Sequence, residues 1–377
     1  MRLAAHLFPD LDPPSRLLLG PGPSIVHPRV LGALSKPTLG HLDPCFQAIM
    51  DDVKRLLQYL FQTENEFTIP VSGTGSAGME AALCNFIEPG DPVLVAVKGY
   101  FGERMADMAG RYGAEVDRLD RPWGEAFDPD EIETRLKAKR YKLVALVHCE
   151  TSTGILQPDI AEIAAAAHRQ GALAVLDAVA SLGGAPVEVD AWDIDVCYTG
   201  SQKCLSAPPG LAPLTLSPRA RQVMKQRKTG VASWYLDLSA IEAYWGSGER
   251  SYHHTAPVNL IYALRESLRM LLEEGLEHQL ARHRDVANML WEGLEELGLF
   301  PRAPRQLRSP TLTTSQLPPG VDDVTVRKHL MDEYNIEISG GFGPLEGQIW
   351  RIGLMGNSAR FEHVKTLLDT LQVVLKQ

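Results

Sequence analysis

The sequence predicts an α/β protein with a large domain built on a mostly parallel sheet and a smaller C-terminal α+β domain. Between about residues 44 and 277, short apolar runs bounded by Gly, Pro or Asp alternate with amphipathic stretches. Such alternation is typical of buried parallel strands that are connected by helices. Beyond residue 258, two long amphipathic stretches lead into shorter and more mixed segments. This change of character predicts the second, smaller unit.

Hydrophobic spacing predicts the elements of the large unit in chain order. Apolar residues from Phe46 to Leu60 recur at helical intervals and indicate a first long helix. The run FTIPV (67–71) predicts a strand, and MEAALCNFI (79–87) predicts the helix after it. Further strands are predicted at 93–97, 143–147, 172–176 and 194–198. Asp128-Pro129-Asp130-Glu131 and Pro158-Asp159 are typical helix starts.

The C-terminal part begins with two predicted helices, at 258–274 and 277–297. The Pro/Arg-rich stretch PRAPRQLRSP then precedes a strand at 311–315, a helix at 322–334, strands near 336–338 and 348–354, and a last helix. We therefore expect an N-terminal extension over 1–15, a large domain over 16–274 and a small domain over 275–377.

Composition and charge exclude several classes of protein. The 377 residues carry a net charge of −10, which argues against nucleic-acid binding because phosphates need clustered cations. The five cysteines are scattered and contain no C-x-x-C pair, a pattern that favours free thiols in a reducing compartment. No apolar stretch approaches the length of a membrane span, and acids and prolines interrupt the N-terminal run. We expect a cytoplasmic protein that binds neither membrane nor nucleic acid.

A glycine-rich stretch, SGTGSAG (72–78), lies between a predicted strand and a predicted helix. Glycines allow a tight turn, and the free N–H groups at the start of a helix attract an anion. A phosphate would therefore bind well there. The stretch also satisfies G-x-G-x-x-G, so a nicotinamide dinucleotide is a competing ligand. A strand-to-helix turn without any ligand is the third possibility.

Two ionisable residues follow strands of the same predicted sheet. Asp177 comes directly after an apolar run, where ligands of open α/β sheets bind, although it could simply cap a helix. Lys203 is the only charged residue between 196 and 218. Burial among apolar neighbours would lower the pKa of its ammonium group, as a nucleophilic amine requires. A phosphate loop, a carboxylate for a ring nitrogen and a buried lysine together predict a pyridoxal phosphate site.

A longer series of motifs makes this prediction more specific. The chain resembles the class V, fold-type I aminotransferases, most closely their alanine–glyoxylate and serine–pyruvate (or serine–glyoxylate) enzymes. The resemblance implies a pyridoxal-phosphate-dependent fold with a seven-stranded type of sheet. It covers about nine tenths of the chain, through LLGPGPS (18–24), SGTGSAGMEAAL (72–83), HCETSTGILQP (148–158), LDAVASLGG (176–184), TGSQKCLSAPPG (199–210), YHHTAPV (252–258), LRES (264–267) and ISGGFGPLEGQIWRIGLMG (338–356).

The resemblance implies a role toward the cofactor for each matching residue. Lys203 would form a Schiff base with pyridoxal phosphate and later carry a proton, while Asp177 would pair with the pyridinium nitrogen. Phe101 falls where related enzymes frequently stack a larger Trp ring on the pyridine. The remaining cofactor contacts would be made by Gly75, Ser76 and Gln202 at the phosphate and by Ser152 and Thr153 at the ring and its 3′-oxygen.

Other matching residues imply a shared site and a substrate pocket. Tyr252 and Thr255 match positions that reach the phosphate in the neighbouring subunit, so the resemblance implies a homodimer. Arg351 matches the arginine that binds the substrate carboxylate, with which a guanidinium can form two parallel hydrogen bonds. Gly22, in GPGPS, would line the entrance opposite Arg351. We expect no metal, because neither His253-His254 nor His148-Cys149-Glu150 has a recognised ligand spacing.

The implied reaction is transamination between a small amino acid, alanine or serine, and a small 2-oxo acid, glyoxylate or pyruvate. The reaction would follow ping-pong kinetics, with pyridoxamine phosphate formed between the two half-reactions. Related enzymes also use 2-aminoethylphosphonate or ureidoglycine as donors, and Asn259 could add polar selectivity or cap a helix. A cysteine desulfurase would need a nucleophilic Cys in the C-terminal half, but no cysteine follows Cys204. A nicotinamide-dependent oxidoreductase, or a binding protein without turnover, would leave Lys203, Asp177 and Arg351 unexplained.

Overall fold

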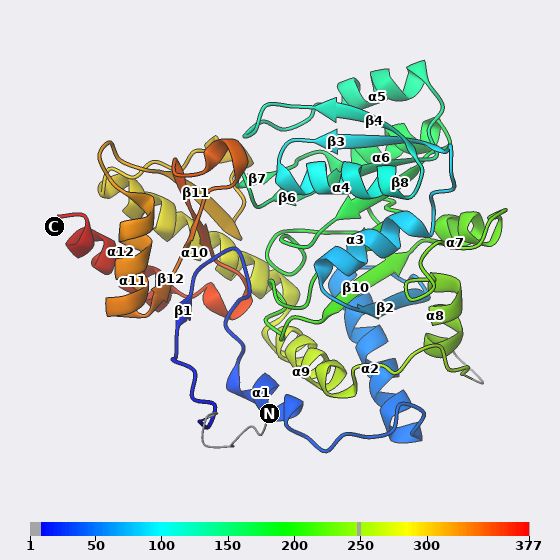
Figure 1. The fold of residues 1–377 in the computed structure, drawn as a ribbon, viewed down its shortest axis with the longest axis horizontal. Coiled ribbons are helices and arrows are strands. Elements are labelled where there is room, and N and C mark those ends of the chain that lie inside the picture. The colour runs from blue at the N-terminus through cyan, green and yellow to red at the C-terminus, as the bar shows by residue number, and fades with distance from the viewer. Residues whose placement is uncertain (1–8, 247–249, 377) are drawn as a thin grey trace, which may run out of the picture.

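A seven-stranded sheet is the centre of the computed structural model, which describes residues 9–246 and 250–376 (Figure 1). Strand β10 runs antiparallel to both of its neighbours, and the other adjacent pairs are parallel. The predicted α/β class with a mostly parallel sheet is therefore confirmed. The strands lie in the order β2 (Phe67–Ser72), β10 (Leu211–Leu216), β9 (Val196–Tyr198), β8 (Leu173–Asp177), β5 (Leu143–Val147), β3 (Pro92–Val97) and β4 (Glu115–Asp120).

Two of these strands were not predicted from the sequence. Strand β4 lies at the edge of the sheet and carries charged residues, so it lacks a buried apolar run. Strand β10 contains Pro213, which argues against a central strand. Pro213 and Pro70 of β2 are paired, but their polar backbone groups point away from each other. The carbonyl oxygen of Pro213 accepts from the N–H of Thr199, so the missing N–H of Pro213 lies on the β9 side, beside the residue that follows this short strand, and that of Pro70 lies on the free edge of β2. Of the five strands expected for this sheet, β5 has the expected bounds, and β2 and β3 are each one residue longer. Strand β8 is shifted by one residue to Leu173–Asp177, and β9 is shortened to Val196–Tyr198.

Helices pack on this sheet and connect its strands. Helix α3 packs against β9 and β10, α4 against β3, and α6 against β8. Helix α3 begins at Gly75, four residues before its expected start at Met79, so half of the glycine-rich stretch is helical. Asp128 caps α5 at the predicted helix start, and its side chain forms a capping box with Glu131. The helices are α1 (Pro28–Leu34), α2 (Pro44–Phe61), α3 (Gly75–Cys84), α4 (Tyr100–Arg111), α5 (Pro129–Ala138), α6 (Ile160–Arg169), α7 (Pro218–Lys225), α8 (Leu238–Trp245) and α9 (Val258–Glu274).

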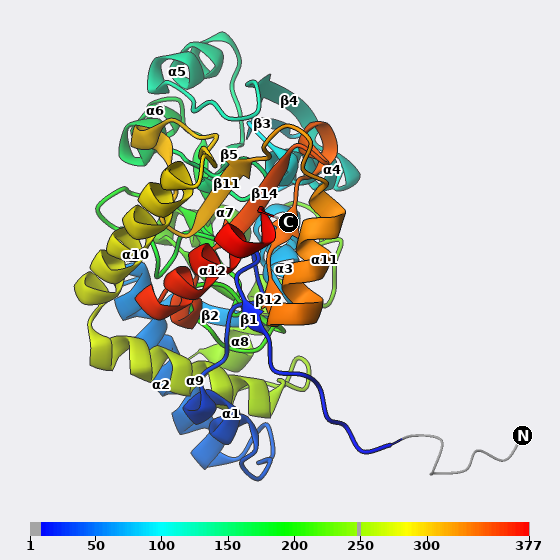
Figure 2. The ribbon, with the colours of Figure 1, turned by 90° about the vertical axis from the view of Figure 1, so that its left-hand side faces the viewer.

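A second layer of structure is formed by the C-terminal residues (Figure 2). Its antiparallel sheet has the order β11 (Leu312–Gln316), β14 (Ile349–Gly353) and β13 (Ser339–Gly340). Helices α10 (Leu276–Glu296), α11 (Asp323–Tyr334) and α12 (Phe361–Val374) surround it. Two short pairs complete the fold: β1 (Leu17–Leu18) with β12 (Ile336–Glu337), and β6 (Cys149–Glu150) with β7 (Ile155–Leu156). Single 3-10 turns occur at Arg305–Leu307, Gly343–Leu345 and Gly356–Ser358.

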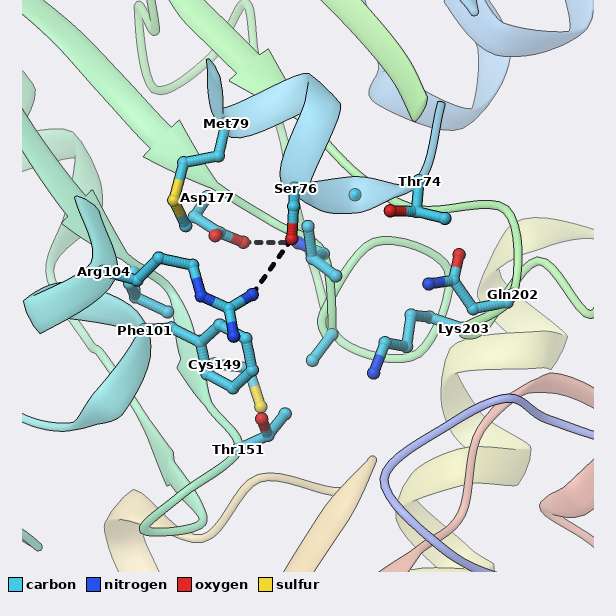
Figure 3. A pocket seen from close by; sticks show the side chains of 14 residues that line it. Thr74, Ser76, Met79, Phe101, Arg104, Cys149, Thr151, Asp177, Gln202 and Lys203 are labelled. Carbon is cyan, nitrogen blue, oxygen red and sulfur yellow. Dashed lines mark hydrogen bonds between the residues drawn. The ribbon is translucent and has the colours of Figure 1, made fainter. Parts of the chain in front are cut away.

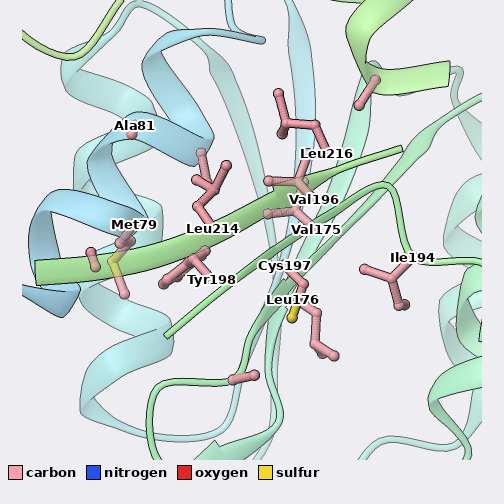
Figure 4. Packing of buried hydrophobic residues seen from close by; sticks show 14 of the residues in the cluster. Met79, Ala81, Val175, Leu176, Ile194, Val196, Cys197, Tyr198, Leu214 and Leu216 are labelled. Atoms are coloured by element: carbon pink, nitrogen blue, oxygen red, sulfur yellow. The ribbon is translucent and has the colours of Figure 1, made fainter. Parts of the chain in front are cut away.

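Two separate hydrophobic clusters correspond to the two units. The larger cluster surrounds the seven-stranded sheet (Figure 4), and the smaller one lies between α10, α12 and the C-terminal sheet. Leu19 belongs to the smaller cluster, although we had expected residues 16–274 to form the large domain. The first eight residues of the expected N-terminal extension lie outside the described residues. The domain boundaries stay predictions. Leu17–Leu18, in the expected large domain, pairs with β12 in the expected small domain.

The carboxyl ends of the parallel strands face the C-terminal unit. In Figure 1 the arrowheads of β3 and β4 point toward it. Ligands of open parallel sheets bind at this edge. No helix within residues 9–246 and 250–376 is long and apolar enough to cross a membrane.

Candidate active site

A cavity of about 220 Å³ lies at the carboxyl edge of the sheet (Figure 3). It brings together residues that are distant in the sequence, from the glycine-rich stretch near 75 to the lysine at 203. The wall includes Thr74, Gly75, Ser76, Met79, Phe101, Arg104, Cys149, Thr151, Asp177, Gln202 and Lys203. The structure therefore places six of the predicted cofactor residues around one space: Gly75, Ser76, Phe101, Asp177, Gln202 and Lys203.

The start of α3 forms one end of the cavity. The first N–H groups of a helix have no partner within the helix, and its N-terminus carries partial positive charge. The turn before it requires glycine at position 73, where φ is +138° and a Cβ would lie 2.5 Å from Cβ of Ala77. Arg104 on α4 donates a 3.0 Å hydrogen bond to Oγ of Ser76. This end of the cavity therefore combines N–H groups, a hydroxyl and a guanidinium, which suits a phosphate.

Asp177 is the last residue of β8 and is almost fully buried. Its Oδ1 accepts a 2.8 Å hydrogen bond from the N–H of Val179, and its Oδ2 accepts one of 2.9 Å from the hydroxyl of Tyr198. Burial raises the pKa of the Asp177 carboxyl to about 6, despite these donors. The carboxylate is therefore fixed in place and would be stabilised by a cationic ring nitrogen.

Lys203 extends into the same cavity from the segment between β9 and β10. Burial lowers the pKa of its ammonium group, which makes a free amine more accessible at neutral pH. Nζ of Lys203 donates to the carbonyl oxygen of Pro21. The neighbouring Gly22 packs directly against the lysine side chain. The N-terminal segment therefore covers Lys203, as the expected position of Gly22 near the entrance implies.

Phe101 lies at the start of α4 and presents its ring to the cavity (Figure 3). The guanidinium carbon of Arg104 lies 4.8 Å from the ring centroid. This cation–π contact helps to fix the orientation of the Phe101 ring at the cavity wall.

The turn after β5 differs from its expected role. Thr151, and not Ser152 or Thr153, lines the cavity. The hydroxyl of Ser152 instead donates a 2.7 Å hydrogen bond to the buried Glu150 carboxylate, and Thr153 is fully buried. The structure thus does not bring Ser152 and Thr153 to the cavity wall, because their side chains stabilise the turn itself.

Arg351 lies on β14, in the C-terminal sheet, and is only 4% exposed. Its guanidinium carbon lies 3.8 Å from the ring centroid of Phe342, and its Nε donates to the carbonyl oxygen of Gly340. Burial lowers the pKa of Arg351 to about 10. Among the described residues no carboxylate forms an ion pair with it. Arg351 lines a second cavity of about 540 Å³ rather than the first one.

Tyr252 and Thr255 lie away from the cavity of their own chain. The side chain of Tyr252 is 55% exposed, and its hydroxyl lies 3.2 Å from Oγ1 of Thr255. No group of three or more potential metal-ligating side chains occurs in the described part of the chain. Asn259 does not face the cavity either, since its amide donates to the carbonyl oxygens of Leu34 and Lys36.

Gln202 provides a test of whether a ligand belongs in the cavity. Its Oε1 is buried and has no hydrogen-bond partner among the described residues. Buried polar atoms are paired in the large majority of cases, so an unpaired one in a cavity wall indicates a missing partner. The oxygen itself is an acceptor, so a phosphate would be bound by the Nε2 donor of the same amide. With that donor, the α3 N-terminus, Asp177 and Lys203, the cavity fits pyridoxal phosphate.

Three residues of the site were missed by the sequence analysis: Arg104, Thr151 and Tyr198. Arg104 could have been found, because it follows Phe101 by three positions on a helix and therefore shares its face. Thr151 is adjacent to the residues that were chosen. Tyr198 lies in an apolar run, and only strand pairing shows what its hydroxyl contacts.

Comparison with known proteins identifies close relatives. A family model described as aminotransferase class-V matches residues 29–349. The (S)-ureidoglycine–glyoxylate transaminase of Bacillus subtilis (strain 168) is 42% identical over 97% of this chain and 92% of that protein. The alanine–glyoxylate aminotransferase of Drosophila melanogaster is 43% identical over 96% of this chain and 93% of its own length. The crystal structure of an alanine–glyoxylate aminotransferase from Nostoc sp. superposes with a TM-score of 0.96 at 49% identity, covering 100% of both chains.

Proposed function

Because the chain belongs to the class V aminotransferases, we propose that it transfers the amino group of alanine or serine to glyoxylate or pyruvate, with pyridoxal phosphate as cofactor. Glyoxylate appears in the names of the Bacillus, Drosophila and Nostoc relatives, which favours it as the acceptor. The Bacillus relative supports (S)-ureidoglycine as an alternative donor.

One observation carries this proposal. The buried amine of Lys203 and the buried carboxylate of Asp177 line the same cavity, and the N-terminus of α3 lies at one end of it. Figure 3 shows the two side chains approaching from opposite sides. An amine, a carboxylate and an anion-binding helix end match the aldehyde, ring nitrogen and phosphate of the cofactor.

When bound, pyridoxal phosphate supplies an aldehyde that links to amines and a ring that withdraws electrons from the substrate Cα. Gly75, Ser76 and Gln202 would bind the phosphate, with Arg104 contributing charge. Asp177 would hold a proton on the ring nitrogen, since an ionised carboxylate favours the cationic ring. Phe101 would cover one face of the ring. Thr151 lies where it could approach the ring from the other wall of the cavity.

Lys203 would serve twice. Its Nζ would anchor the cofactor covalently, and after displacement by the donor it would take the proton from the donor's Cα. Desolvation supports both tasks, because it increases the fraction of neutral amine. The guanidinium of Arg351 would orient the substrate carboxylate at the cavity entrance, opposite Gly22.

We further propose a cytoplasmic homodimer. The exposed Tyr252 and its partner Thr255 have no role in the cavity of their own chain, which supports action on a second subunit. The five cysteines are all free, and four of them are buried, which favours a reducing compartment.

Spectroscopy and labelling test the proposal directly. The purified protein should show a visible absorption band that disappears with borohydride, and peptide mapping should then find the label on Lys203. Lys203→Ala should abolish both the band and transamination, whereas Lys225→Ala, at an exposed position of α7, should change neither. Alanine, serine and (S)-ureidoglycine, each tested alone, should bleach the band according to donor preference. A wild-type protein that binds no pyridoxal phosphate would refute the proposal.

A further inference from the structure

We propose that Tyr198 is a positioning residue, whose hydroxyl holds the carboxylate of Asp177 in the orientation from which it meets the cofactor ring nitrogen. This inference rests on the proposed function. It assigns a role to a buried side chain that does not line the cavity.

Strand register brings the two residues together. Strands β8 and β9 are parallel neighbours, and Asp177 and Tyr198 are directly paired at their ends. The N–H of Ala178 donates a 2.9 Å hydrogen bond to the carbonyl oxygen of Tyr198, which locks this register. Directly paired residues project from the same face of a sheet. The hydroxyl and the carboxylate therefore meet because of backbone pairing.

Packing fixes the tyrosine ring. Tyr198 is fully buried, and Figure 4 shows it between Met79 of α3 and the strands of the sheet. Gly78 leaves the space for the ring, since a Cβ there would lie 3.2 Å from Cδ2 of Tyr198. The ring thus connects the helix that forms the anion end of the cavity with the strand that carries Asp177. With the ring immobile, its hydroxyl is a fixed reference point.

The hydrogen bonds of Asp177 explain why the tyrosine matters. The N–H of Val179 donates to Oδ1, and it comes from the same turn as Asp177 itself. The Tyr198 hydroxyl donates to the other oxygen at 2.9 Å. Without that second donor, only one of the two oxygens would be held, so the plane of the carboxylate would be less restricted. Each carboxylate oxygen accepts about two hydrogen bonds, so a place remains for a ring N–H.

Ionisation states agree with this geometry. Burial raises the pKa of Tyr198 well above its usual value, so the hydroxyl keeps its proton and acts as a donor at neutral pH. The donated hydrogen bond favours the ionised form of Asp177, which burial disfavours. The carboxylate must be ionised to stabilise a protonated ring nitrogen.

The chain contains a matched control for the substitution Tyr198→Phe. Tyr141, which is also buried, donates a 2.7 Å hydrogen bond to Oδ2 of Asp117. Asp117 lies on β4, the edge strand that is farthest from β2. Tyr141→Phe removes the same type of hydrogen bond outside the active site. A hydrogen bond to a charged group corresponds to roughly a tenfold effect or more. We expect Tyr198→Phe to weaken pyridoxal phosphate binding to the apoprotein about tenfold, and Tyr141→Phe to leave it unchanged.

Three readouts separate positioning from a structural defect. Thermal unfolding of the two apoprotein variants should be similar. The 15N chemical shift of the ring nitrogen in labelled cofactor should move toward the unprotonated value in Tyr198→Phe alone. The kcat of the Tyr198→Phe variant should fall about tenfold, with little change in the KM of the amino donor. If Tyr198→Phe matches Tyr141→Phe in affinity and in 15N shift, the role of Tyr198 is disproved.

A double-mutant cycle gives an independent test that remains valid if Tyr198→Phe is less stable. In the Asp177→Asn background the hydroxyl has no carboxylate to hold, so Tyr198→Phe should not weaken cofactor binding further. An equal loss of affinity in both backgrounds would overturn the proposal. Failure of wild-type protein to bind pyridoxal phosphate would instead refute the proposed function.

Discussion

Gly22 and Lys203 are in direct contact: a Cβ at position 22 would lie 2.8 Å from Nζ and 2.9 Å from Cδ of the lysine. These separations are too short for non-bonded carbon and nitrogen atoms. The φ of Gly22 is +112°, a conformation that other residues rarely adopt. The N-terminal segment therefore restricts position 22 to glycine where it covers the buried amine.

Gly22→Ala should displace Lys203 and reduce covalent attachment of the cofactor. We expect the visible absorption band to fall by at least about half, since the lysine must leave its present rotamer. Gly32→Ala is the control, because a Cβ on this exposed residue of α1 meets no atom within 4 Å. That variant should retain the full band. A Gly22→Ala protein with wild-type spectrum and affinity would contradict the contact.

Gln202→Leu should affect stability and binding in opposite directions. Leucine has a similar size and removes a buried oxygen without a partner, so the free energy of unfolding of the apoprotein should stay equal or rise by about 1 kcal/mol. Affinity for pyridoxal phosphate should fall roughly tenfold, since an amide contact to the phosphate is lost. Urea unfolding and cofactor titration measure the two effects. Parallel loss of both would indicate a purely structural glutamine.

Asp177→Asn should stabilise the apoprotein at neutral pH. The folded-state pKa of Asp177 is raised from 3.8 to about 6, so ionisation destabilises the folded chain progressively between these values and fully above them. Asparagine does not ionise. The difference in the free energy of unfolding between the variant and wild type should therefore increase by about 2 kcal/mol between about pH 4.5 and about pH 7.5. Denaturant unfolding at the two pH values measures this change.

Asp117, whose pKa is lowered, is the control for this pH effect. The hydrogen bond from Tyr141 lowers the pKa of Asp117, so its ionised form contributes stability above the unfolded-state pKa and loses that contribution as the pH falls. Asp117→Asn should therefore destabilise the protein at neutral pH, and less so in acid. The same sign for both variants would disprove the assignment.

Arg104→Gln should weaken binding of the cofactor phosphate. Its guanidinium lies beside Ser76 at the anion end of the cavity, so we expect a loss of about 3- to 10-fold in affinity for pyridoxal phosphate. The difference in affinity between Arg104→Gln and wild type should be smaller at high salt, because screening weakens the attraction between the guanidinium and the phosphate. Arg111→Gln, on the same helix but paired with Asp107 on the surface, should bind normally. Equal affinities for the two variants would exclude a role for Arg104.

Arg351→Lys should affect the substrate and not the cofactor. Lysine retains the charge but lacks the planar fork that matches a carboxylate, so the KM of both substrates should rise about tenfold or more. The dissociation constant of pyridoxal phosphate should be unchanged. Arg327→Lys is the comparison, because Arg327 lines the same 540 Å³ cavity while both of its contacts go to Asp323. A larger KM effect at Arg327 would move the carboxylate site to that residue.

Local physical chemistry made much of the fold predictable from the sequence. The run from Phe46 to Leu60 has helical periodicity and became α2. Helix α9 has the predicted bounds, Val258–Glu274, because the preceding proline marks its start and Gly275 its end. The helix start at Asp128 and the position of Asp177 at the carboxyl end of a strand depend on a few neighbouring residues, although β8 includes Asp177 and was expected to end one residue earlier.

The same reasoning failed where pairing between distant segments overrides local pattern. Pro213 made β10 unlike a central strand, but its missing N–H lies beside Thr199, the residue after the end of β9. Ser152 and Thr153 were chosen from the motif, but the buried Glu150 holds Ser152 and leaves Thr151 at the cavity. No property of residues 149–153 alone distinguishes these three hydroxyls.

The sequence by itself therefore determined the α/β class, the order of the motifs and the candidacy of Lys203 and Asp177, since each depends on residue type and close neighbours. The family resemblance added Gln202. Tertiary structure alone decided that Gly22 covers Lys203, that Arg104 reaches Ser76 and that Tyr198 holds Asp177. These contacts join residues that are 181, 28 and 21 positions apart in the sequence. Contacts of this kind arise from strand register and helix packing, which the chain specifies only as a folded whole.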